Sequence, residues 1–233
     1  RGRLEAAGLL PEHEGWNTQN ITNDLDIVIL GMHARPDNPE LLRAQELGLT
    51  VQSYPEFLRF ATEDKRRRVV AGSHGKTTIT AMLLHVLDRV GRKTDFMVGA
   101  QLAGFDRMVQ LSDAPDILLE GDEYLSSPLD LTPKFHWYKP HMTILTGVAW
   151  DHINVFPDPD HYREQFVIYL NKMEQGGTVV WYAGDTELQR VMEAVLPARP
   201  DLVSIPYDMP GHHVEDDRLV LDLPEGKFPL GTL

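Results

Sequence analysis

A glycine-rich turn between a predicted strand and a predicted helix is the strongest chemical signal in the sequence. The segment Gly72-Ser-His-Gly-Lys-Thr-Thr78 follows the apolar residues 69–71. Small residues allow successive backbone N–H groups and a helix N-terminus to converge on phosphate oxygens. Lys76 is placed to reach the β- and γ-phosphates of a nucleotide, and the Thr77 hydroxyl to bind Mg²⁺. The turn is shorter than the usual phosphate loop, with Gly72 as its first glycine. The nucleotide-binding residues that we expect are Gly72, Ser73, His74, Gly75, Lys76, Thr77 and Thr78.

A second predicted strand ends in a cluster of carboxylates. The apolar residues 117–119 run directly into Glu120-Gly-Asp-Glu-Tyr124. The carboxyl ends of parallel strands meet at one sheet edge, so we expect this cluster beside the glycine-rich turn. Glu120, the first carboxylate after the strand, is therefore the candidate ligand for the Mg²⁺ of a bound nucleotide. Three roles stay open for Asp122 and Glu123: support of the metal ligands, contact with substrate, or a solvated acidic loop.

A third predicted strand leads to a histidine. Residues 144–154 pass from an apolar strand through a turn to Asp151-His152. A neutral imidazole is a competent metal ligand when a neighbouring group fixes its tautomer, and Asp151 is the candidate neighbour. An isolated histidine is more often an ordinary loop residue, but three motifs that end at one sheet edge favour a metal site. His33, at the end of an earlier strand, is either a substrate contact or a turn residue.

Other types of active site have little support. Ser73 and Ser126 lack the glycine pattern of a strand-to-helix elbow, which argues against a serine nucleophile. There is no GxGxxG motif, so a nicotinamide cofactor is unsupported. The sequence contains no cysteine, which excludes disulfide bonds and thiolate zinc sites and is typical of a reducing compartment.

Composition limits the class of protein. The chain has 233 residues, of which 42% are hydrophobic, enough for a sizeable core. With 35 acidic against 22 basic side chains, the formal net charge is -13, which argues against nucleic acid as a partner. No apolar run reaches the roughly 20 residues of a membrane-spanning helix, and the N-terminus has no signal-peptide pattern. We expect a cytoplasmic protein without a membrane partner, and the sequence leaves its oligomeric state open.

The order of predicted elements favours an α/β fold. Predicted strands and helices alternate, which is typical of a mostly parallel sheet with helices on both faces. The expected strands are 26–31, 50–52, 69–71, 116–120, 142–146 and 178–182, and the expected helices begin at Pro39, Pro55, Lys76 and near residues 160 and 185. The helix after the glycine-rich turn is expected to bury Met82, Leu83, Val86, Leu87 and Val90. Short strands at 202–205, 218–223 and 228–230 predict a small antiparallel addition, and the charged run 63–68 predicts a domain boundary.

Together the three motifs resemble those of the Mur ligases, the family that builds the peptide stem of bacterial cell-wall precursors with ATP. The resemblance is carried by residues 72–78, 120–124 and 151–152, in this order. It implies a partial Rossmann-like, UDP-sugar-binding domain over residues 1–66. A P-loop central ATPase domain with a mostly parallel sheet is implied over residues 67–233. The family's C-terminal ligase domain has no counterpart in the sequence, so we expect the chain to be a piece of a longer polypeptide.

The resemblance also implies a reaction. The lactyl carboxylate of UDP-N-acetylmuramate attacks the γ-phosphate of ATP, and the amine of an amino acid or short peptide then displaces phosphate from the acyl phosphate. Lys76, Glu120 and His152 are the implied catalytic residues. Mg²⁺ is the implied metal, with Thr77 and Glu120 on one ion and His152 on a second. Loss of Lys76 is expected to reduce activity far more than stability.

Within the family, residues 120–124 look more like those of the members that attach the tripeptide L-alanyl-γ-D-glutamyl-meso-diaminopimelate in peptidoglycan recycling. Members that attach L-alanine in biosynthesis are the alternative; they usually have small residues where Gly121 and Tyr124 stand here. The related folylpolyglutamate synthetases are disfavoured, because the region before residue 69 resembles the end of a nucleotide-sugar domain. A nucleotide-binding module without ligase activity is a further alternative.

Overall fold

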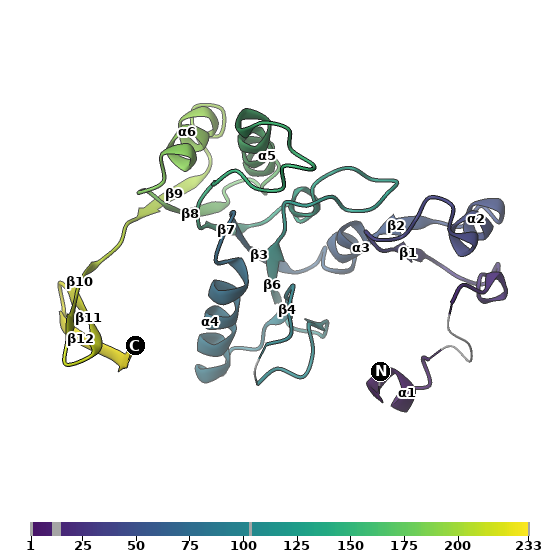
Figure 1. Cartoon of the computed structure of the whole chain (residues 1–233), viewed down its shortest axis with the longest axis horizontal. Helices are drawn as coiled ribbons and strands as arrows, with labels where there is room; N and C mark the ends of the chain where they lie inside the picture. Colours follow the sequence, from purple (N-terminus) through teal and green to yellow (C-terminus); the bar gives the residue numbers. More distant parts are fainter. Residues whose placement is uncertain (1, 11–14, 103, 233) are drawn as a thin grey trace.

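A seven-stranded sheet forms the centre of the molecule (Figure 1). The computed structural model describes residues 2–10, 15–102 and 104–232. The strand order is β5-β4-β6-β3-β7-β8-β9, and all neighbours are parallel except β4 and β5. The strands are β3 (Arg66–Ala71), β4 (Asp95–Met97), β5 (Val109–Gln110), β6 (Asp116–Gly121), β7 (Met142–Leu145), β8 (Thr178–Tyr182) and β9 (Val203–Tyr207). The predicted α/β class with a mostly parallel sheet is confirmed.

The register of the three central strands brings their carboxyl ends to one level. Ala71 at the end of β3 pairs with Gly121 at the end of β6 and with Leu145 at the end of β7. The three loops that follow these strands therefore start side by side, as expected for the motifs of the sequence. Gly121 has no room for a side chain, because a Cβ would lie 2.7 Å from Val69 Cγ1 and 3.0 Å from Ala71 Cβ.

Helices cover the sheet on two sides (Figure 1). Helix α4 (Lys76–Arg89) packs on one face, where Val70, Leu118 and Leu84 share a cluster. On the other face lie α5 (Pro159–Asn171), α6 (Thr186–Val195) and the short 3₁₀ helix η2 (Lys134–Trp137). Successive residues of β3 and β6 point to opposite faces of the sheet, so these strands contribute side chains to the apolar clusters on both faces. This two-sided core holds the strand ends in place.

The buried side of α4 differs from the prediction. Thr80 and Leu84 are its buried residues, and Leu83 and Leu87 are half-buried. Met82, Val86 and Val90 lie on the opposite, exposed side of the helix. A run with apolar residues on most of its circumference does not specify which stripe packs, and here the contact with Val70 and Leu118 decides it.

Two parallel strands and two longer helices form the N-terminal part. Strand β1 (Val28–Leu30) pairs with β2 (Val51–Ser53), and the helices are α2 (Pro39–Glu46) and α3 (Tyr54–Ala61), preceded by α1 (Gly2–Ala6) and η1 (Thr18–Asn20). Asn38 and Ser53 cap α2 and α3, each followed by a proline in the first turn. Strands β1 and β2 and helices α2 and α3 agree with the sequence-based expectation, whereas α1 and η1 were not predicted. Leu58 of α3 is buried in the main core, while the charged residues from Arg66 onward belong to β3.

The C-terminal part departs from the prediction in one strand. Residues 202–205 were expected in the antiparallel addition, but β9 pairs in parallel with β8 and belongs to the central sheet. The antiparallel addition itself is present, formed by β10 (Gly211–Glu215), β11 (Arg218–Leu223) and β12 (Gly226–Thr232). Figure 1 shows this small sheet at the end of the chain, apart from the central one. Among the described residues, no helix has the length and apolar character needed to span a bilayer.

A buried histidine makes the fold sensitive to acid. His136 of η2 is 4% exposed, stacks on Phe135 and contacts the Gln165 carbonyl oxygen through Nε2 at 2.8 Å. Burial lowers the His136 pKa to about 4, the Gln165 carbonyl opposes this shift, and Lys172 adds to it. The unfolded chain therefore binds a proton near pH 6.5 that the folded chain binds only near pH 4.

We predict that His136→Gln reduces the loss of stability on acidification. The neutral histidine stabilises the fold fully above about pH 6.5, and this contribution falls by up to about 1.4 kcal/mol per pH unit as the pH drops towards 4. Urea unfolding between pH 7 and 4.5 measures the slope. His85→Gln, at an exposed position of α4, is the matched control. An unchanged slope in His136→Gln would show that His136 is protonated in the native state.

Candidate functional site

The glycine-rich turn connects β3 to α4 in a conformation that only glycine permits at its start. Gly72 has φ +125°, and a Cβ there would overlap Thr146 Oγ1 and lie 2.9 Å from the Gly147 carbonyl oxygen. Gly75, with φ +75°, caps α4, so the N–H groups of the first helical turn point into the turn. His74, Gly75 and Thr78 are exposed here, as a nucleotide-binding loop requires.

Ser73 connects this turn by hydrogen bonds to the loop that follows β7. Its backbone N–H and its hydroxyl both donate to the Gly147 carbonyl oxygen, at 3.0 and 3.2 Å, and its Oγ accepts from Ala149 N–H. Thr146 Oγ1 donates to the His74 carbonyl oxygen at 2.6 Å. Ser73 was predicted to bind the nucleotide; here its polar groups are occupied within the protein. The turn and the loop after β7 therefore form one hydrogen-bonded unit.

Thr77 and Glu120 come together at the mouth of the turn. Thr77 Oγ1 donates to Glu120 Oε1 at 2.7 Å, and Gly99 N–H donates to Glu120 Oε2 at 3.0 Å. Glu120 is 8% exposed, so both oxygens are held. A hydroxyl and a carboxylate at hydrogen-bond distance from each other are hard oxygen donors of the type that Mg²⁺ prefers. The residues predicted for the first metal ion thus lie together and fit it chemically.

Lys76 points to a different carboxylate. Its ammonium donates to Glu123 Oε2 and to the Gly72 carbonyl oxygen, both at 2.8 Å, and to the Ser73 carbonyl oxygen at 3.4 Å. The Glu123 side chain is 0% exposed and also accepts from the Tyr162 hydroxyl at 3.1 Å. Burial, reinforced by the negative charge of Glu123, raises the Tyr162 pKa, which keeps its hydroxyl a donor. Glu123 is therefore part of the site and not of a solvated loop.

His152 contacts Glu123 and not Asp151. Its Nε2 lies 3.3 Å from Glu123 Oε1, and its ring packs edge-on against Tyr124 at 5.1 Å between centroids. The Asp151 carboxylate accepts from the backbone N–H of His152 at 2.6 Å. The expectation that Asp151 fixes the ring was wrong, because Asp151 caps the backbone where His152 adopts φ +55°.

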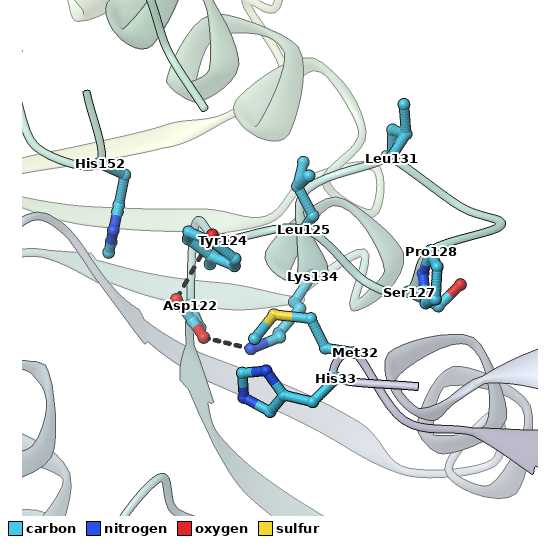
Figure 2. Close-up of a pocket in the computed structure, with 10 residues that line it drawn as sticks. All are labelled: Met32, His33, Asp122, Tyr124, Leu125, Ser127, Pro128, Leu131, Lys134 and His152. Atoms are coloured by element: carbon cyan, nitrogen blue, oxygen red, sulfur yellow. Dashed lines mark hydrogen bonds and ion pairs between the residues drawn. The ribbon is translucent and has the colours of Figure 1, made fainter. Parts of the chain in front are cut away.

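A cavity of about 390 Å³ opens beside these residues (Figure 2). Asp122 and Lys134 form an ion pair of 2.5 Å in its wall. Burial acts to raise the Asp122 pKa, but the Lys134 ammonium outweighs it and holds the pKa below its usual range. Figure 2 shows Met32 and His33, from the loop after β1, beside Lys134, so the N-terminal part contributes to the same cavity.

A candidate cation position lies on the His152 side of the cavity. Ligand atoms of Asp122, Glu123 and His152 all lie within 4.8 Å of one another. The Glu120 carboxylate, by contrast, is held by Thr77 and Gly99. The structure therefore brings the predicted residues to one edge in two groups, one around Glu120 and one around His152. Tyr162 and Lys134 were missed by the sequence analysis, because no motif marks a lone tyrosine on a helix or a lysine at the start of a short 3₁₀ helix.

Comparison with known proteins finds relatives that are both named as UDP-N-acetylmuramate ligases. No family model matches the chain. The chain is 28% identical over 180 residues to UDP-N-acetylmuramate–L-alanyl-gamma-D-glutamyl-meso-2,6-diaminoheptandioate ligase of Escherichia coli K12, covering 77% of this chain and 39% of that protein. It is 30% identical over 183 residues to UDP-N-acetylmuramate–L-alanine ligase of Syntrophomonas wolfei, covering 78% and 38%.

A solved structure supports the same relation at the level of the fold. The ligase for UDP-N-acetylmuramate and L-alanyl-gamma-D-glutamyl-meso-diaminopimelate from Neisseria meningitides superposes with a TM-score of 0.79 at 24% identity. The match covers 95% of this chain and 72% of that one. Of the two curated relatives in the sequence comparison, the chain spans less than two fifths of the length: 39% of the Escherichia coli protein and 38% of the Syntrophomonas wolfei protein.

The buried pair of Lys76 and Glu123 revises the expectation that Lys76 matters little for stability. We predict that Lys76→Met weakens ATP binding more than tenfold and also destabilises the fold by about 1–3 kcal/mol, because it leaves the Glu123 carboxylate buried without its cation. The double variant Lys76→Met/Glu123→Gln should regain stability but not ATP binding. Calorimetric titration and urea unfolding measure the two quantities.

The exposed Lys93→Met serves as the control for loss of a lysine. A Lys76→Met protein that binds ATP as the unaltered chain does would contradict the assignment of Lys76. A double variant no more stable than Lys76→Met would contradict the buried-charge explanation.

Proposed function

The chain belongs to the Mur ligase family, and we propose that it forms the nucleotide-binding part of an ATP-dependent, ADP-forming carbon–nitrogen ligase. One observation carries the proposal: Lys76, Thr77, Glu120 and His152 lie at one edge of the parallel sheet, beside a cavity of about 390 Å³. Ligands of open α/β sheets bind at this edge. This position supports the proposal that the four residues bind ATP and its metal ions.

Phosphoryl transfer needs positioned reactants and neutralised oxygens. In the proposed reaction a substrate carboxylate attacks the γ-phosphate of ATP, ADP leaves, and an amine displaces phosphate from the acyl phosphate. The turn at residues 72–75 and the N-terminus of α4 cradle the phosphates, while Lys76 offsets their charge. Mg²⁺, held by Thr77 and Glu120 with a second ion on His152, supplies further charge neutralisation when bound.

UDP-N-acetylmuramate is the proposed carboxylate substrate. Residues 1–66 would contribute to its binding as a partial nucleotide-sugar domain, with residues 67–233 as the central ATPase domain. Met32 and His33 support this, because they extend the N-terminal part into the cavity next to His152. The cytoplasm, where ATP is available, is the proposed location.

For the amine we propose the tripeptide L-alanyl-γ-D-glutamyl-meso-diaminopimelate, as in peptidoglycan recycling. The segment Glu120-Gly-Asp-Glu-Tyr124 supports this choice: Tyr124 lines the cavity and packs on His152, a role that a small residue cannot fill. L-alanine is the alternative, since a relative named for that substrate reaches 30% identity. A nucleotide-binding module that never forms an amide is the remaining alternative.

Phosphate release tests the proposal. The longest polypeptide that contains this chain is incubated with ATP, Mg²⁺ and UDP-N-acetylmuramate, with the tripeptide in one reaction and L-alanine in another. We predict release that requires both UDP-N-acetylmuramate and the tripeptide and that is lost in Lys76→Met. Release with L-alanine alone would assign the biosynthetic step. ATP consumption at the same rate with and without UDP-N-acetylmuramate would contradict a ligase and favour the nucleotide-binding module.

A further inference from the structure

One carboxylate, that of Glu123, connects the two halves of the site. It follows Glu120 by three positions, yet its side chain is 0% exposed, whereas the site around it is open to the cavity. Its Oε2 accepts from the Lys76 ammonium, and its Oε1 lies 3.3 Å from His152 Nε2. The lysine at the end of the turn and the histidine of the loop after β7 thus each lie next to one oxygen of the same carboxylate.

The Lys76 ammonium still has a donor to offer in this arrangement. It makes two short hydrogen bonds of 2.8 Å, to Glu123 and to the Gly72 carbonyl oxygen, and one long contact of 3.4 Å to Ser73. An ammonium carries three donors, so the long contact can be exchanged for a phosphate oxygen while the two short ones persist. Glu123 therefore orients Lys76 without having to release it.

Tyr162 holds Glu123 from another layer of the fold. Its hydroxyl donates to Glu123 Oε1 at 3.1 Å from α5, and its side chain is fully buried in the main core. A buried carboxylate with fixed donors on both oxygens has little freedom to rotate. The α5 helix thus sets the position of a group that meets both Lys76 and His152.

We propose that Glu123 is a positioning residue that holds Lys76 and accepts a hydrogen bond from the Nε2–H group of His152. Nδ1 is then the unprotonated ring nitrogen, available to a ligand or metal ion. The inference rests on the proposed function of the site. A ring nitrogen that donates to a buried carboxylate fixes the tautomer, and the other nitrogen then keeps its lone pair. Glu123 would take the part that the sequence suggested for Asp151.

Replacement by glutamine gives a distinctive result. An amide has one accepting oxygen and one donating NH₂ group. Lys76 can only donate, so the amide oxygen of Glu123→Gln must face it, and the NH₂ group must face His152 Nε2. Nε2 then has to accept, which moves the ring proton to Nδ1. The substitution is therefore expected to reverse the tautomer of His152.

Long-range ¹H–¹⁵N NMR of the metal-free and nucleotide-free chain tests this at pH 8, where an ordinary imidazole is neutral. The His152 signals are assigned by their loss in His152→Gln. We predict the Nε2–H tautomer in the unaltered chain and the Nδ1–H tautomer in Glu123→Gln. An Nδ1–H tautomer in the unaltered chain, or no reversal in a folded Glu123→Gln protein, would overturn the proposal.

A second readout uses Tyr162→Phe, which keeps the charge of Glu123. We predict a three- to tenfold fall in the ratio of ATP to ADP affinity, the equivalent of about one hydrogen bond, because the γ-phosphate depends on the position of Lys76. Tyr169→Phe is the matched control: it lies on the same helix, is 0% exposed, and loses a hydroxyl contact of 2.8 Å to Thr143. Equal ratios in the two variants would overturn the positioning role.

These measurements separate the inference from the proposed function. If the unaltered chain does not bind ATP but shows the Nε2–H tautomer that Glu123→Gln reverses, the arrangement of Glu123 and His152 holds while the nucleotide function fails. The opposite result is that the chain binds ATP through Lys76, but Glu123→Gln leaves the His152 tautomer unchanged and Tyr162→Phe leaves the ratio of ATP to ADP affinity unchanged. In that case the function holds and the inference fails.

Discussion

The parallel register of β3, β6 and β7 is the constraint on which the site depends. Ala71, Gly121 and Leu145 are paired across these strands, so three loops far apart in sequence start at one level. The absence of a side chain at Gly121 lets β6 pack against Val69 at this point. A shift of one residue would turn the strand side chains to the opposite face and separate the loops. The contacts of Thr77 with Glu120 and of Lys76 with Glu123 each connect the start of α4, which follows β3, with the end of β6 or the loop after it.

Buried charge is tolerated at this edge because each charged group has fixed partners. A carboxylate that loses water must regain its hydrogen bonds inside the protein. Glu123 does so through Lys76 and Tyr162, and Glu120 through Thr77 and Gly99. In a chain with a net charge of -13, the approach of an anionic nucleotide depends on this local arrangement of Lys76 and on the metal ions that the acidic groups attract.

Sequence patterns predicted the features that depend on local chemistry. The strands that end next to residues 72 and 120, the helix starts at or next to Pro39 and Pro55 and the glycine-rich turn all follow from short-range rules. Strands β4, β5 and β10 were missed: β4 and β5 have only three and two residues, and β10 lies in a polar run. The buried stripe of α4 and the partner of His152 depend on groups distant in sequence. Tyr162 lies 39 residues from Glu123, and no spacing rule connects them.

The central claim is that this edge of the sheet binds ATP with Mg²⁺. A crystal structure of the chain with a non-hydrolysable ATP analogue and Mg²⁺ tests it most directly. The account predicts the phosphates over the turn at residues 72–75, the terminal phosphate in contact with Lys76, and a metal ion on Thr77 and Glu120. A nucleotide bound elsewhere, or a metal ion that avoids both Thr77 and Glu120, would contradict it.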